Sequence, residues 1–192
     1  LHRALVALLL SSAAVVATAH DPPMQLSKAD QIGEYVFGLF QDRDGNIWFG
    51  NSNGDCRYDG ETLTYLNGDR AMAIAQDRSG AIWIAGNTDT VRRYDDGTFT
   101  EYVVADGIRT MLIDSTDSIW IGSVRGGVSR FDGEAFVPFS IEHATYGIAE
   151  DRDGTIWFGL GDAGACKYDG ESVDYYTTDD GLAGNTVRSV HA

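Results

Sequence analysis

Short apolar runs alternate with polar turns rich in Asp, Asn and Gly along most of this chain. The first cycle contains four such runs, at residues 35–41, 47–50, 56–58 and 62–66. Runs of this length, rich in β-branched and aromatic residues and bounded by Asp-Gly or Asn-Gly turns, predict β-strands. No helical period follows residue 19. The pattern therefore predicts an all-β fold built from four-stranded antiparallel units.

Each unit has one tryptophan and, six residues before it, one aspartate. The pairs are Asp42 and Trp48, Asp77 and Trp83, Asp114 and Trp120, and Asp151 and Trp157. The tryptophans follow one another at intervals of 35, 37 and 37 residues. A constant period of this size is typical of repeat proteins, and a repeated four-stranded meander is a propeller blade. We predict a β-propeller at 34–192, with blades at about 34–66, 70–102, 109–139 and 145–176 and the first strand of a fifth at 186–192.

The repeated residues favour structural roles. We expect each Trp to pack between neighbouring blades and each Asp to close its turn through an Asx-type side-chain bond. The alternative for the Asp-x-Asp-Gly stretches is a calcium loop, but its further acidic ligands are missing. Cys56 and Cys166 occupy the same position of the first and fourth units, too far apart for a disulfide, so we expect two buried free thiols. No Cys/His spacing suits zinc, and the sequence predicts no metal and no cofactor.

The N-terminus resembles an export signal. A short basic start, an apolar stretch and Ala17-Thr18-Ala19 predict a signal peptide at 1–19. A buried helix and a membrane anchor are the alternatives, although the stretch is short for a membrane span. Residues 20–33 are polar and predict a disordered leader. We expect a bacterial protein that is periplasmic or secreted, with no membrane span after signal cleavage.

Composition excludes one class of partner. The formal charge is −15 at pH 7, so the surface is unsuited to nucleic acid, whose phosphates require Lys and Arg. Hydrophobic residues make up 43% of the chain, which is enough for a packed core.

The loops divide into two groups by topology. In a four-strand meander, the first and third turns lie on one face of the propeller and the other connections lie on the opposite face. The first group is stereotyped, whereas the second varies between units, and function tends to reside on variable loops held by a rigid scaffold. We predict a ligand site on the variable face, near the central axis. Its candidate residues are Arg70, Asn87, Arg109, Arg125, His143 and Tyr146.

This mixture of polar and aromatic groups suits a neutral polar ligand such as a saccharide. The alternative is a solvated rim with no ligand. Catalytic signatures are weak, because His143 is the only histidine inside the repeats and no Ser lies in a nucleophile-elbow motif. The sequence therefore predicts a protein that is not an enzyme.

The motif Glu-Asp-Arg-Asp-Gly-Thr-Ile-Trp-Phe-Gly at 150–159, followed by Cys-Lys-Tyr-Asp-Gly at 166–170, resembles the two-component regulator propeller repeat. Asp-Gly-Leu-Ala-Gly-Asn-Thr-Val at 180–187 is similar to that family's link into a new blade. The resemblance implies a sensing module like those of periplasmic sensor regions, which detect extracellular compounds, often oligosaccharides. A streptogramin-lyase-like enzyme and a scaffold for protein partners are the alternatives.

Propellers of this family usually have more blades than four. Three explanations are open: the sequence is truncated, four blades close with a surplus strand, or another chain completes the ring. We favour truncation, because the sequence starts at Leu1 and stops where the next turn Asp is expected.

Overall fold

A computed structural model describes residues 34–52, 54–66, 70–104 and 107–192. The predicted signal peptide (1–19) and leader (20–33) lie outside these residues. Within the described ranges there is no helix that could cross a membrane.

Four antiparallel sheets, each with four strands in chain order, make up the described fold. The first contains β1 (Val36–Gln41), β2 (Ile47–Asn51), β3 (Gly54–Tyr58) and β4 (Leu63–Tyr65). The second contains β5 (Ala71–Gln76), β6 (Ile82–Gly86), β7 (Thr90–Asp95) and β8 (Thr98–Val103). The third contains β9 (Ile108–Ile113), β10 (Ile119–Ser123), β11 (Gly127–Phe131) and β12 (Phe136–Pro138). The fourth contains β13 (Thr145–Glu150), β14 (Ile156–Leu160), β15 (Ala165–Tyr168) and β16 (Val173–Tyr176), and a 3-10 helix, η2 (Thr178–Asp180), follows it. The prediction of an all-β propeller with four-stranded blades is confirmed.

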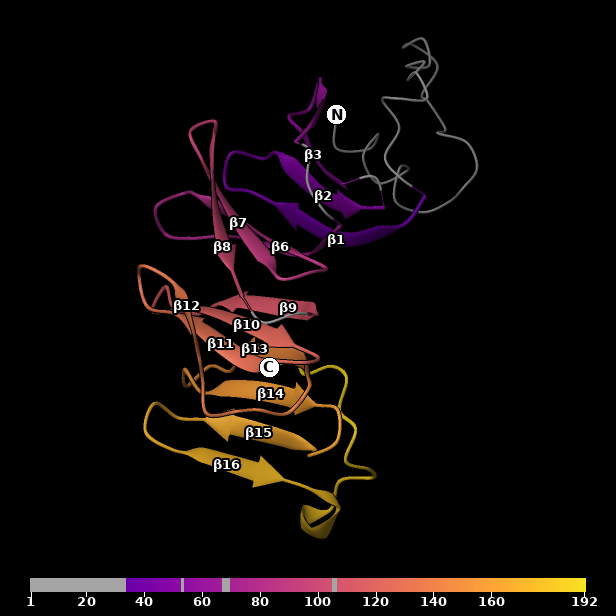
Figure 1. Cartoon of the computed structure of the whole chain (residues 1–192), viewed down its shortest axis with the longest axis vertical. Helices are drawn as coiled ribbons and strands as arrows, with labels where there is room; N and C mark the ends of the chain where they lie inside the picture. The colour runs from indigo at the N-terminus through magenta and orange to yellow at the C-terminus, as the bar shows by residue number, and fades with distance from the viewer. Residues whose placement is uncertain (1–33, 53, 67–69, 105–106) are drawn as a thin grey trace.

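The blades follow one another along the long axis of the molecule, from the first sheet at one end to the fourth at the other (Figure 1). Their first strands, β1, β5, β9 and β13, are neighbours in that order. We call them the inner strands. Because the first and fourth sheets lie at opposite ends, these four blades do not close into a ring.

A glycine at or near the end of the second strand lets the next inner strand approach closely. A Cβ on Gly50 would lie 2.3 Å from the carbonyl oxygen of Ala71, the first residue of β5. Gly122 faces Thr145 in the same way, and Gly159 faces Val187. Val187 therefore takes the place that the first residue of an inner strand takes in the earlier blades.

The segment predicted as a fifth first strand, 186–192, is not a strand in the structure. A β-strand requires a hydrogen-bonded ladder with a neighbour, whereas this segment is held by single contacts. The backbone N–H of Val187 donates to the Leu160 carbonyl at 2.8 Å, and the Thr186 hydroxyl donates to the Gly161 carbonyl at 2.9 Å. The segment packs beside the fourth blade without a sheet of its own.

Tryptophan packs each blade against the next. Trp48 is 2% exposed and its ring lies 5.4 Å from that of Tyr94 in the second blade. Trp83 and Trp120 make equivalent contacts with aromatic rings of the third and fourth blades. Burial of these large rings, on the order of 3–5 kcal/mol each against truncation to Ala, holds the row of blades together.

Candidate functional site

The turns between the first and second strands form one face of the propeller, and their aspartates are fully occupied by hydrogen bonds. The Oδ1 atom of Asp42 accepts the backbone N–H of Asp44 and of Asn46, at 3.0 and 2.8 Å. This is the predicted Asx-type bond. The Oδ2 atom accepts the indole N–H of Trp48 at 2.8 Å, and the other three turns repeat this bond at 2.7–2.8 Å. The hydrogen bond from the indole was not predicted, although the constant spacing of six residues between Asp and Trp is its signal in the sequence.

These hydrogen bonds lower the pKa of the turn aspartates. Burial by itself would raise the pKa of Asp42, but donors from Trp48, Asn46 and Asp44 outweigh it and lower the pKa. The hydrogen bond from Trp157 lowers the pKa of Asp151 in the same way. Both oxygens of each turn aspartate accept N–H donors. The aspartates that a calcium loop would use as its principal ligands are therefore already engaged in hydrogen bonds.

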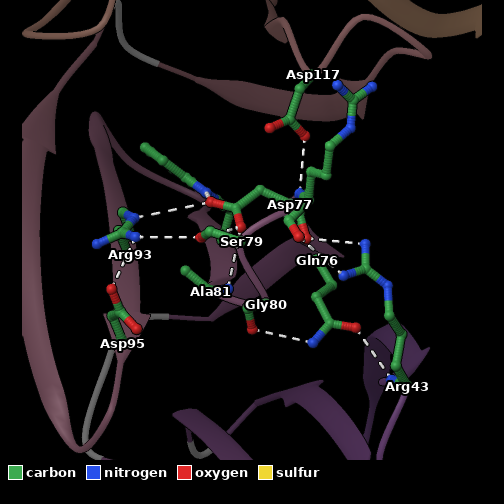
Figure 2. Close-up of polar contacts among 11 residues, drawn as sticks. Arg43, Gln76, Asp77, Ser79, Gly80, Ala81, Arg93, Asp95 and Asp117 are labelled. Atoms are coloured by element: carbon green, nitrogen blue, oxygen red, sulfur yellow. Dashed lines mark hydrogen bonds and ion pairs between the residues drawn. The ribbon is translucent and has the colours of Figure 1, made fainter.

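Adjacent turns are joined by arginines (Figure 2). The guanidinium of Arg43 donates to the carbonyl oxygen of Asp77 at 2.9 Å. The backbone N–H of Arg43 donates to the Gln76 side chain at 3.0 Å. The backbone N–H of Arg78 donates to Asp117 of the third blade at 2.8 Å. The side chains of this face, which we call the turn face, therefore stabilise the contacts between blades.

The opposite face, formed by the other connections, is called the loop face. Arg70 lies directly before β5, and its guanidinium sits over the ring of Phe37 at 4.6 Å. Arg109 and Tyr146 are the second residues of β9 and β13. These inner strands are neighbours, so Arg109 and Tyr146 occupy equivalent positions on adjacent strands.

The other predicted residues are more scattered. The His143 Nδ1 atom is 3.0 Å from an oxygen of Asp162, and its ring faces Tyr175 at 6.0 Å. Burial raises the pKa of Tyr175, with further contributions from Cys166 and Glu142. This group lies on the loops of the fourth blade. Asn87 follows β6 and makes no hydrogen bond within the described part of the chain, and Arg125 lies in the connection between β10 and β11.

A hollow of about 510 Å³ lies along the inner strands β9 and β13 and the segment 188–192. Tyr146 and Arg188 line its loop-face end, and the Arg188 guanidinium is 6.0 Å from the Tyr146 ring. Thr110 and Glu150 also line it, but Glu150 is engaged by the backbone N–H of Ser115 at 2.7 Å. Arg188 and Phe37 were not among the residues predicted for the site. Both were detectable as the counterparts of Tyr146 in the aligned repeats.

The comparison with protein families gives one match. The model described as "Two component regulator propeller" matches residues 30–53 and 140–162. A search of the curated protein sequences found no match.

Several solved structures are similar to the chain. The extracellular domain of a protein described as a hybrid two component system from B. thetaiotaomicron has a TM-score of 0.66 and 19% identity, covering 81% of this chain and 26% of that chain. Virginiamycin B lyase from Staphylococcus aureus has a TM-score of 0.63 and 19% identity, covering 73% of this chain and 55% of that chain. A surface component of the type-IX secretion system of Porphyromonas gingivalis has a TM-score of 0.56 and 16% identity, covering 82% of this chain and 29% of that chain.

At these identities the structural similarities show a shared fold. The chain spans little more than half of the lyase and about a quarter of the two component system domain. The family match covers two stretches, residues 30–53 and 140–162, which are similar to the two component regulator propeller repeat.

Proposed function

We propose that this chain is a non-catalytic, exported sensor-type module that binds a saccharide or another small polar ligand on its loop face. One observation carries the proposal. The turn face uses its arginines and aspartates to join blades, whereas Tyr146 and Arg188, at a position whose side chain varies between repeats, line the loop-face end of the hollow. Side chains that differ between repeats are free to meet a ligand, because the scaffold does not depend on them.

The family supports this proposal. A two component regulator propeller similar in fold to the extracellular domain of a hybrid two component system has the architecture expected of a receptor domain. The extracellular location of that domain supports a periplasmic or secreted location for this chain. Signalling itself would require an effector.

An enzymatic function is the second candidate, because the fold is also that of virginiamycin B lyase. The group that favours it is His143 with Asp162, since a carboxylate can orient an imidazole for general acid–base catalysis. Tyr175 is the nearby titratable hydroxyl. We favour the binding function, because His143 lies on the loops of the fourth blade rather than in the hollow lined by Tyr146.

A glycan array with the purified protein tests the binding function, and calorimetry then measures each hit. We expect at least one saccharide to bind. Tyr146→Ala should weaken it about tenfold, which corresponds to about 1.4 kcal/mol, while Glu134→Gln on the turn face should leave it unchanged. An array without a hit, or binding that is insensitive to Tyr146→Ala, contradicts the proposal.

Incubation with quinupristin, the compound present in the solved structure of virginiamycin B lyase, followed by mass spectrometry, tests the enzymatic alternative. A product of quinupristin that forms with the wild type and disappears in His143→Ala would establish an enzyme and overturn the non-catalytic assignment. Intact quinupristin after prolonged incubation is the result we expect.

A further inference from the structure

When the four inner strands are aligned, the chemical type of the side chain varies most at their second position. Their first residues are Val36, Ala71, Ile108 and Thr145, and their fourth residues are Leu39, Ile74, Met111 and Ile148. Both sets contain small or aliphatic side chains, and those of the second to fourth blades are buried or partly buried, whereas Val36 and Leu39 of the first blade are exposed. The second residues are Phe37, Met72, Arg109 and Tyr146, and Arg188 is the equivalent residue of the last segment. This position combines aromatic, apolar and cationic side chains, so the packing of the blades does not determine it.

The cations at this level are held over aromatic rings. The guanidinium of Arg70 lies 4.6 Å from the Phe37 ring, and that of Arg188 lies 6.0 Å from the Tyr146 ring. Arg109 lies on the inner strand between these two pairs. No described carboxylate is within ion-pair distance of any of these three arginines. Cation–π contacts therefore position the guanidiniums of Arg70 and Arg188 without neutralising them.

Most other cations of the described chain are already engaged. Arg57, Arg93 and Arg130 lie over the tryptophan of their own blade. Arg43 and Arg78 join neighbouring turns. The guanidiniums of Arg109 and Arg188 have no described hydrogen-bond or carboxylate partner and lie at the loop-face end of the inner strands, and Arg152 is their exposed counterpart on the turn face.

Negative charge is concentrated on the opposite face. Ten exposed acids lie in the turns of the turn face, against three exposed arginines; these acids are Asp44, Asp59, Glu61, Asp95, Asp96, Asp132, Glu134, Asp153, Asp169 and Glu171. The described acids of the loop face lie in its connections, in η2 and before β1; they are Glu34, Asp89, Glu142, Asp162, Asp179 and Asp180. No inner strand has an acid at its second position. An anion is therefore repelled from the turn face and attracted to the axial end of the loop face.

We propose that the second positions of the inner strands form the specificity-determining part of the ligand site, and that they select an acidic oligosaccharide, one that carries carboxylate or sulfate groups. Arg109 and Arg188 bind the anionic groups, and Tyr146 and Phe37 stack against the apolar faces of sugar rings. Guanidinium is suited to this role because its planar donors match a carboxylate or a sulfate. The inference rests on the proposed binding function and replaces the neutral ligand expected from the sequence with an anionic one.

The test is an array that pairs each acidic saccharide with a neutral counterpart: galacturonate oligomers with their methyl esters, sulfated with unsulfated chondroitin oligomers, and sialylated with desialylated lactose. Calorimetry on each hit then compares the wild type with Arg109→Gln, Arg188→Gln and Arg152→Gln. Arg152 is the matched control, because it is an exposed arginine on the turn face. We expect acidic members alone to bind, with about tenfold weaker binding for each inner-strand variant. We also expect no change for Arg152→Gln and weaker binding at higher salt.

The outcomes separate this inference from the proposed function. Neutral saccharides that bind as well as acidic ones, with an affinity unaffected by Arg109→Gln and Arg188→Gln, overturn the acidic site and leave the sensor function standing. Acidic binding that Arg152→Gln weakens equally also overturns it, since the charge of the whole molecule would then be responsible. An array with no hit contradicts both.

Discussion

A buried ion pair between the first and second blades gives the sharpest test of how this propeller is held together. Asp55 on β3 is 1% exposed and pairs with Arg92 on β7, which is 8% exposed. In the other blades the position of Asp55 is Val91, Val128 or Ala165, and that of Arg92 is Cys56, Ser129 or Cys166. Two charges thus replace two small side chains at one interface.

The expected costs differ between the partners. Arg92→Ser leaves the Asp55 carboxylate buried, and loss of one member of a buried pair costs about 3–5 kcal/mol. Asp55→Val should cost less, about 2 kcal/mol, because Arg92 still has Glu101 opposite it on β8 and the Phe99 ring 4.9 Å away. Burial lowers the pKa of Arg92, and the charge of Glu101 opposes this shift. The double variant Asp55→Val/Arg92→Ser has the residue types of Val91 and Ser129, which occupy the equivalent positions of the second and third blades, and it should unfold within about 1 kcal/mol of the wild type.

Urea unfolding followed by tryptophan fluorescence measures all four proteins, since each blade contains one tryptophan. The coupling energy of the double-mutant cycle should exceed about 2 kcal/mol. Costs that simply add, with the double variant as unstable as the sum of the single variants, would show that the two charges do not interact. The claim that Asp55 and Arg92 form a stabilising ion pair between the first two blades would then be wrong.

Three further predictions concern the scaffold. Gly50→Ala should destabilise the protein by about 1–3 kcal/mol in thermal unfolding, because its Cβ would meet the Ala71 carbonyl at 2.3 Å, while Gly184→Ala, with no atom within 4 Å, should be neutral; equal stabilities would contradict the close approach. Stability to urea should fall as the pH drops below about 4, because the four turn aspartates have native pKa values below the ordinary 3.8. Their contribution to stability is fully present above that ordinary value and is lost as the pH falls through the native pKa. An unchanged urea midpoint from pH 6 to pH 3 would refute this prediction. Burial raises the pKa of Cys56 to about 11 and of Cys166 to about 12, so neither thiol should react with a disulfide reagent at pH 8 until urea is added, and rapid labelling of the native protein would contradict their burial.

Much of the architecture was predictable, because in a repeat protein each unit can be aligned with the other units of the same chain. The spacing of Trp48, Trp83 and Trp120 fixed the period, and a strand of three to six residues between Asp-Gly turns could pair only with its neighbours in the chain. Antiparallel meanders depend on tight turns between consecutive strands, and short sequence motifs such as Asp-Gly predict these turns. The assignment of variable residues to one face followed from the same topology.

The candidate site was predictable only in part. Arg109 and Tyr146 could be placed on one face from their positions in the repeat, but the contact between their inner strands depends on how the blades pack. The pairing of Arg188 with Tyr146 also joins different blades. His143 was grouped with the others by topology, whereas the structure places it with Asp162 on the loops of the fourth blade.

The sequence by itself determined the blade: its four strands, its turn aspartate and the tryptophan six residues later, because these features depend on contacts within about 35 residues of chain. The tertiary structure alone decided what lies between blades. It paired Asp55 with Arg92, laid Arg70 over Phe37 and placed Val187 where an inner strand begins. Such contacts depend on the distance and angle between whole sheets, which are set by the packing of many side chains together and have no local signature in the chain.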